Sequence, residues 1–237
     1  MSSKPIDETR YKKLAGEAAA DHLASGMVVG LGHGSTAVWA IRRLAELLWD
    51  GKLENIWAIP CSKQVESLAH SLRIPLTTLA EHPVIDLTID GADEVDPRLN
   101  LIKGAGGALL HEKIIAQASR RELIVVDAGK LVPVLGSRGP LPVEVVPFGL
   151  RTQAEFLAGL GAKVALRENE AGDPYVSDEG NHIFDCDFGA IHDPARLAAR
   201  LDGRAGIVGH GLFLGLASEV IVAGPAGIER IAPPDAP

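Results

Sequence analysis

The chain has 237 residues, of which 46% are hydrophobic and 23% are charged, and this composition predicts a globular protein of one or two domains. Its formal net charge of -8 and the lack of any clustered run of Lys and Arg argue against nucleic acid as a partner, because binding to a phosphate backbone needs such clusters. Cys61 and Cys186 lie far apart without neighbouring ligands at metal-binding spacing, so we expect neither a disulfide framework nor a metal site, and a reducing cytoplasm is the expected compartment.

A membrane location is not expected. The N-terminal stretch "MSSKPIDETRYKK" mixes both charges and lacks the apolar core of a signal peptide. Residues 206–228 form a long apolar segment, but His210, Glu219 and repeated glycines make a bilayer span costly. We expect two short buried strands around a glycine-rich turn there.

Strands and helices alternate through the first 130 residues. Such alternation predicts a Rossmann-like, mostly parallel sheet with helices on both faces and right-handed crossovers, in which ligands bind at the carboxyl ends of the strands. The expected elements are a helix at 9–24, a strand at 27–32, a helix at 35–48, a strand at 56–60, a helix at 62–72, a strand at 84–90, a helix at 108–119 and a strand at 122–128.

The alternation ends at "VLGSRGPLPVEVVPFG", residues 134–149, where prolines and glycines indicate a boundary. The smaller unit after it is expected to be α+β and ferredoxin-like, and the apolar tail from Gly206 is expected to return to the first sheet. We therefore predict an α/β catalytic domain formed by residues 1–135 and 211–237, and a smaller α+β domain of residues 136–210. The elements expected in the smaller domain are a strand at 143–148, a helix at 150–161, strands at 162–168 and 181–188, and a helix at 194–202.

The first motif with chemical meaning is "GLGHGSTA", residues 30–37. Glycines end the expected strand, and Ser35 and Thr36 begin the expected helix. Backbone N–H groups and the helix dipole therefore favour a bound anion. The glycines fall at every second position, which differs from the dinucleotide fingerprint, and no lysine follows as in a P-loop. A phosphate site is predicted here, and a strand-to-helix turn with a capping serine is the alternative.

Two further motifs bring carboxylates together with a lysine. "DGADEVD", residues 90–96, lacks the order of a calcium loop, and its carboxylates could transfer protons or bind sugar hydroxyls, or form a solvated acidic turn. In "KGAGGALLHEKI", residues 103–114, the helix dipole lowers the pKa of Glu112 and burial raises it, so in a closed site Glu112 approaches the range of a general base. Lys103 could then neutralise charge on a substrate oxygen. The alternative is a first-turn glutamate that interacts with the dipole, beside a solvated lysine.

The last motif, "VVDAGK" at residues 125–130, delivers Asp127 and Lys130 at the end of a strand. Lys130 is a candidate phosphate contact. His33 and His111 flank the motifs, and a structural hydrogen-bonding role is expected for each, as for most lone histidines.

Taken in this order, the motifs resemble those of ribose-5-phosphate isomerases of the A type, over about Tyr11 to Arg230. The resemblance implies an aldose–ketose isomerase that interconverts D-ribose 5-phosphate and D-ribulose 5-phosphate in the non-oxidative pentose phosphate pathway, without metal or organic cofactor and as a homodimer or homotetramer. The motifs that carry it are "GLGHGSTA", "DGADEVD", "KGAGGALLHEKI", "VVDAGK" and "LPVEVVPF".

The resemblance also implies roles for individual residues. Glu112 would move a proton between C1 and C2 through an enediolate, Lys103 would stabilise the oxyanion, and Asp90 or Asp93 would assist ring opening. The implied substrate-binding residues are His33, Gly34, Ser35, Thr36, Asp90, Gly91, Ala92, Asp93, Lys103, Gly104, Ala105, Gly106 and Lys130.

Two other classes of protein have related folds. A sugar-phosphate sensor of a transcription regulator would carry a helix-turn-helix, and the segment before the first strand is too short for one. A coenzyme A transferase also uses a catalytic glutamate, but the acidic motif together with the phosphate turn favours a phosphosugar. The decision therefore depends on the site residues rather than on the fold.

The chain departs from the family pattern at His33, where threonine is common, and at Ala105, where glycine is common. Alanine disfavours a positive φ, which leaves the loop conformation in question. A histidine titrates near pH 6.5, so we predict that KM rises with pH through this range and that His33→Thr flattens the dependence. KM measured across this range for both proteins tests it, and identical profiles would contradict a role of His33 in phosphate affinity.

Overall fold

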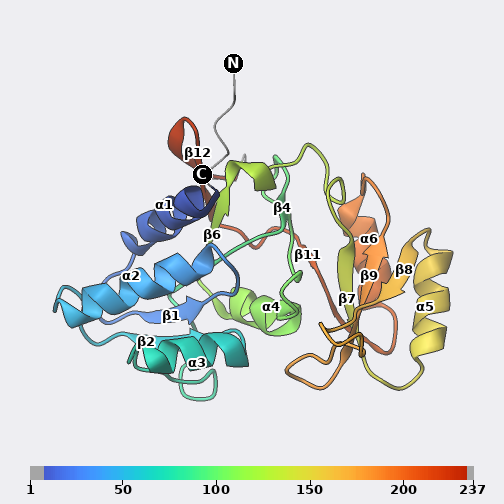
Figure 1. Cartoon of the computed structure of the whole chain (residues 1–237), viewed down its shortest axis with the longest axis horizontal. Coiled ribbons are helices and arrows are strands. Elements are labelled where there is room, and N and C mark those ends of the chain that lie inside the picture. The colour runs from blue at the N-terminus through green and yellow to red at the C-terminus, as the bar shows by residue number, and fades with distance from the viewer. Residues whose placement is uncertain (1–7, 234–237) are drawn as a thin grey trace. The chain divides into compact units, whose positions relative to one another are not determined.

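The computed structural model describes residues 8–233, which form two compact units (Figure 1). The first unit contains residues 8–91, 118–130 and 218–233, and the second contains residues 92–117 and 131–217. Within residues 8–233, no helix is both long and apolar enough to cross a membrane.

The first unit is built on a six-stranded sheet with the order β13-β12-β6-β3-β1-β2. All neighbouring pairs are parallel except β12 and β13, which form an antiparallel hairpin at one edge. Every residue of the central strand β6 is buried, as expected for a strand covered on both faces. The strands are β1 (Val28–Leu31), β2 (Trp57–Pro60), β3 (Leu87–Asp90), β6 (Glu122–Asp127), β12 (Glu219–Gly224) and β13 (Gly227–Ile231).

Helices α1 (Glu8–Ala20), α2 (Ala37–Trp49) and α3 (Lys63–Ser71) belong to the same unit. The chain crosses from β1 to β2 through α2 and returns past β1 to β3 through α3, so right-handed crossovers place these helices on opposite faces of the sheet (Figure 1). The prediction of a mostly parallel sheet with helices on both faces is confirmed.

The second unit contains a four-stranded antiparallel sheet with the order β10-β7-β9-β8. With its two helices it has the βαββαβ sequence of ferredoxin-like folds, and its core is formed by apolar side chains such as Val143, Leu157, Phe184 and Leu201. Its elements are β7 (Leu141–Val145), α5 (Leu150–Gly159), β8 (Lys163–Leu166), β9 (His182–Asp187), α6 (Pro194–Asp202) and β10 (Ile207–His210).

A second, very short sheet in this unit has the order β11-β5-β4. It consists of β4 (Glu94–Val95), β5 (Leu101–Ile102) and β11 (Leu212–Phe213), all antiparallel. Helix α4 (Leu109–Ala118) follows β5 after the Lys-Gly loop. The Lys-Gly loop therefore follows a strand of this antiparallel sheet rather than a strand of the parallel sheet.

The tail from Gly206 also differs from its prediction. Between 206 and 228 the structure has β10, β11, β12 and the start of β13, rather than two strands. Only β12 and β13 join the first sheet. The short β10 and β11, which are separated by Gly211 alone, pair with β7 and β5.

The compact units divide the chain at other points than the predicted domains. Residues 92–117, 131–135 and 211–217 pack with the second unit, because β4 and β5 pair with β11. The predicted domain boundaries at 135 and 211 stay a prediction.

Candidate active site

In the first unit, the turn after β1 and the end of β3 are fixed to each other by Asp90. This side chain is 1% exposed, and its Oδ1 accepts the N–H groups of His33 at 2.9 Å and Gly91 at 2.7 Å. A Cβ at Gly32 would lie 2.3 Å from Asp90 Cγ, so glycine is required for the two strand ends to approach. The structure thus brings together His33, Asp90 and Gly91.

The turn itself has the features of an anion site. Gly34 has φ +113, which a side chain would strain, and the Thr36 side chain makes no capping hydrogen bond to α2. His33 Nδ1 lies 3.1 Å from Ser62 Oγ, and Ser35 is exposed. A cavity of about 440 Å³ is lined by residues 32–35 of the turn together with side chains of α2 and α3. The helix N-terminus therefore faces a space that a phosphate could enter.

Lys130 ends a short 3-10 helix, Ala128–Lys130, directly after β6. Asp127 shapes this turn, because its Oδ1 accepts the Gly129 N–H at 2.9 Å. Asp127 therefore has a structural role, and Lys130 is half-buried at the carboxyl end of a strand of the parallel sheet.

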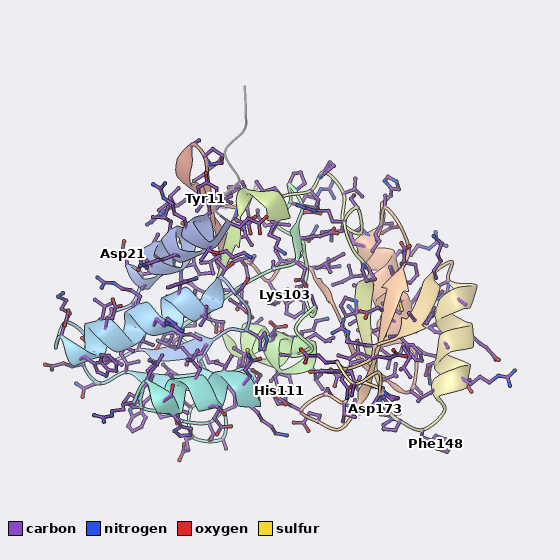
Figure 2. The ribbon with its side chains drawn as sticks, viewed as in Figure 1. Tyr11, Asp21, Lys103, His111, Phe148 and Asp173 are labelled. Carbon is purple, nitrogen blue, oxygen red and sulfur yellow. The ribbon has the colours of Figure 1, made fainter. Side chains whose placement is uncertain are left out.

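In the second unit, Lys103 and Glu112 form a buried ion pair. Lys103 Nζ lies 3.0 Å from Glu112 Oε1, and the two residues are 2% and 4% exposed (Figure 2 labels Lys103). This contact stabilises the ionised forms of both groups. The alternative of a solvated lysine is therefore wrong. A carboxylate held against an ammonium can take a proton from carbon while the cation stabilises the oxyanion that forms.

The Lys-Gly loop is held by Asp93, whose Oδ2 accepts the Ala105 N–H at 2.9 Å. Gly104 and Gly107 have positive φ values of +107 and +83. Ala105 does not have a positive φ, so alanine fits this position without strain. Ala92, Ala105 and Gly106 lie in the same unit as Asp93 and Lys103.

The acidic motif does not form one cluster of equivalent carboxylates. Glu94 is 2% exposed and anchors a loop, because its carboxylate accepts the N–H groups of Gly136 at 2.6 Å and Arg138 at 2.8 Å. Asp96 accepts the N–H groups of Arg98 and Asn100 within its own turn. These two carboxylates are structural, which leaves Asp90 and Asp93 as candidates for chemistry.

Two residues that the sequence did not single out, Gly211 and Phe213, support Lys103. The Gly211 carbonyl accepts the Lys103 N–H at 2.9 Å, and the Lys103 ammonium lies 5.5 Å from the centre of the Phe213 ring. A Cβ at Gly211 would lie 2.3 Å from the Lys103 carbonyl oxygen. Residues this distant in sequence carry no common motif, and only the pairing of β11 with β5 reveals them.

A half-buried lysine, Lys113, lies next to Glu112 on α4. Lys113 Nζ donates to the His210 carbonyl at 2.7 Å and lies 4.9 Å from the centre of the Phe213 ring. Burial lowers the pKa of Lys113 to about 8, although Asp202 opposes the shift. Burial, followed by the charge of Lys113, lowers the pKa of His210 to about 4.

The hydrogen bonds of His210 assign its tautomer. Nδ1 accepts the Leu212 N–H at 3.2 Å and lies 3.3 Å from Lys113 Nζ. The proton is therefore on Nε2, which donates to Asp202 Oδ1 at 3.0 Å. His210 is thus a neutral link between α6 and α4.

Comparison with known proteins assigns the chain to a class: its relatives and its fold are those of aldose–ketose isomerases. The family model of ribose 5-phosphate isomerase A (phosphoriboisomerase A) matches residues 57–227. The chain belongs to this family.

Individual relatives cover nearly the whole chain. Ribose-5-phosphate isomerase A of Chloroflexus aurantiacus is 54% identical over 228 residues, which are 96% of this chain and 95% of the relative. A solved D-ribose-5-phosphate isomerase in complex with phospho-erythronic acid is 37% identical with a TM-score of 0.92, over 97% of this chain and 100% of the other. The ribose 5-phosphate isomerase of Plasmodium falciparum is 36% identical with a TM-score of 0.91, over 94% and 98% of the two chains.

We predict that Gly211→Ala displaces Lys103, because the added Cβ would clash with the Lys103 carbonyl oxygen. This oxygen can move only if the pairing of β5 with β11 is disturbed. Isomerase kcat/KM should fall about 100-fold, as expected for a displacement of about 1 Å, while the circular dichroism spectrum is unchanged. Gly209→Ala is the matched control, since its nearest contact would be an ordinary 3.4 Å to a leucine side chain. Equal activity of the two variants would contradict the role of Gly211.

We also predict a stability that depends on His210. Its pKa is about 4 when folded and near 6.5 when unfolded, so protons bind the unfolded chain more tightly in this range. The contribution of neutral His210 to the free energy of unfolding is fully present above pH 6.5. It is lost as the pH falls towards 4, by an amount on the order of 3 kcal/mol.

Urea unfolding at pH 7 and pH 5 tests this prediction. The loss of stability at pH 5 should be smaller in His210→Gln than in the wild type. His70→Gln, at an exposed histidine on α3, serves as the control and should behave as the wild type. Equal losses in the His210 variant and the wild type would contradict the prediction.

Proposed function

We propose that the protein interconverts D-ribose 5-phosphate and D-ribulose 5-phosphate, with Glu112 as the base. The observation that carries the residue assignment is the buried pair of Lys103 and Glu112 at 3.0 Å. The family and its relatives, which are named for this reaction, support the substrate.

In the proposed mechanism, Glu112 takes the proton from C2 of the open-chain aldose and returns it to C1. The electrons of the C2–H bond form the C1–C2 double bond of an enediolate, and the negative charge on oxygen is stabilised by the Lys103 ammonium. A second proton moves from O2 to O1, so the product is the ketose and no oxidant or reductant is needed.

We assign the oxygen-to-oxygen proton transfer and ring opening to Asp93 rather than to Asp90. Asp93 is half-buried, and its Oδ2 holds the loop that follows Lys103. Asp90 is 1% exposed, and its Oδ1 already accepts two backbone N–H groups, which suits a role in fixing the turn. We propose that this turn, His33 to Thr36, binds the phosphate together with Lys130.

The ligand of one solved relative agrees with this mechanism. Phospho-erythronic acid, bound in that protein, is a phosphorylated sugar acid whose carboxylate carries negative charge on two oxygens. An enediolate also carries its charge on neighbouring oxygens. Such a ligand should therefore bind this chain more tightly than the sugar phosphate does.

We further propose that the protein acts in the cytoplasm, in the non-oxidative pentose phosphate pathway, as a homodimer or homotetramer. The two widely separated cysteines support a reducing compartment. The apolar side chain of Phe148, which is 92% exposed, supports a contact with another copy. Light scattering on the purified protein tests the assembly.

We predict that Glu112→Gln lowers kcat by a factor of about 10² to 10⁴, the usual contribution of a general base, with little change in KM. Because the variant leaves a buried ammonium without the carboxylate at 3.0 Å, a stability loss of about 3 to 5 kcal/mol is also expected. Ketose formation is measured in the presence of a chelator, which should leave the wild type active because Lys103 supplies the positive charge.

Glu112→Asp controls for the lost charge. It keeps the carboxylate but withdraws it by one methylene, so it should preserve stability better and still lose most of its turnover. Full activity of Glu112→Gln would refute the assignment of the base. A wild type that binds ribose 5-phosphate without turnover would instead identify a sensor.

A further inference from the structure

The Lys-Gly loop is held from the smaller sheet by Arg167. This residue follows β8, and its Nη1 donates to the carbonyls of Gly104 at 2.8 Å and Ala105 at 3.3 Å. The arginine side chain is 12% exposed, and its bond to the Gly104 carbonyl is partly shielded from water, whereas its bond to the Ala105 carbonyl is exposed. Arg167, which is 63 residues from Gly104 and 62 from Ala105 along the chain, thus binds two peptide groups of the loop.

Asp185 fixes the guanidinium in this orientation. It lies on β9, and its two oxygens accept from Nε and Nη2 of Arg167, with 3.0 Å for the Nε contact. A bidentate pair of this kind sets the plane of the guanidinium. Because Nε and Nη2 are used by Asp185, Nη1 is the group directed at the loop.

Tyr175 completes the contact at the other end of the loop. The Arg167 guanidinium lies 6.0 Å from the centre of the Tyr175 ring, and the Tyr175 N–H donates to the Arg167 carbonyl at 2.8 Å. The Tyr175 hydroxyl occupies the space beside Gly107, since a Cβ there would lie 2.2 Å from it. The glycine that precedes α4 therefore makes room for the tyrosine.

The loop is held from a second direction by Asp93, which accepts the Ala105 N–H. Opposite groups of the Ala105 residue, its N–H and its C=O, are thus bonded to two different side chains. The loop joins Lys103 to the helix that carries Glu112. Any shift of the loop would therefore change the geometry of the ion pair.

We propose that Arg167, together with Asp185 and Tyr175, is a positioning residue for the isomerisation. It holds the Lys-Gly loop so that Lys103 and Glu112 keep their catalytic geometry, and it binds carbonyl dipoles that would otherwise be free to turn towards an anionic intermediate. The kinetic part of this inference rests on the proposed function, whereas the position of the loop does not.

The test uses Arg167→Lys in the full-length protein. Lysine keeps the charge, but one ammonium cannot bond both Asp185 oxygens and both loop carbonyls. We expect kcat/KM for ribose 5-phosphate to fall about 10-fold to 100-fold, mainly through kcat, as for other small displacements of catalytic groups. Asp185→Asn, which weakens the bidentate pair, should change kcat in the same direction by a smaller factor.

Lys163→Gln is the matched control. Lys163 pairs with Asp187 at 3.5 Å across the same two strands, but its side chain is 90% exposed. Its removal deletes an exposed ion pair between the same two strands without reaching the loop. This variant should keep wild-type kinetics.

Amide hydrogen exchange supplies a readout that does not depend on activity. In Arg167→Lys, the amides of Ala105 and Gly107 should exchange faster than in the wild type and in Lys163→Gln. Unchanged exchange, or a lower melting temperature with unchanged kcat and exchange, would overturn the proposal. If the wild type does not isomerise ribose 5-phosphate while loop exchange still rises in the variant, the proposed function fails and the positioning of the loop stands.

Discussion

The structure depends on the burial of one ion pair, Lys103 with Glu112. Removing two charges from water costs several kcal/mol for each, and only close pairing with well-placed neighbours offsets that cost. The Phe213 ring packs against the ammonium, and the Gly211 carbonyl fixes the lysine backbone. A second lysine, Lys113, is half-buried and its ammonium lies over the same ring. The short sheet of β4, β5 and β11 contains the strand that precedes Lys103 and the Phe213 ring that contacts both lysines.

Sequence patterns predicted the parts of the fold in which apolar residues recur at regular spacing. The alternation of apolar strands and amphipathic helices predicted the parallel sheet, and glycines before Ser35 and Thr36 predicted the turn after β1. Strands of two residues, such as β5 and β11, are too short to show any period, so their pairing was not foreseen. The unexpected division of the chain into its compact units follows from these same strands.

The candidate site was predictable where residue type alone restricts the chemistry. Glu112 and Lys103 were singled out because a carboxylate and a lysine flank a glycine-rich loop, and the structure places them in contact. Asp90 and Asp93 could not be told apart as the residue that assists ring opening, since both are aspartates of one motif and only their hydrogen bonds in the structure differ. The contacts of Arg167 and Gly211 had no local signal, because each acts on a loop or strand far away along the chain.

The connectivity of the first sheet has a consequence for synthesis on the ribosome. Strand β12 pairs with β6, yet about 90 residues separate them, and β13 follows β12. While the intervening segments emerge, β6 is an unprotected edge whose side chains are all destined for the interior. A nascent chain that stalls before Ser218 would expose this edge to other chains. Pairing of the β12–β13 hairpin with β6 therefore covers this edge last, when the C-terminal part of the chain has been made.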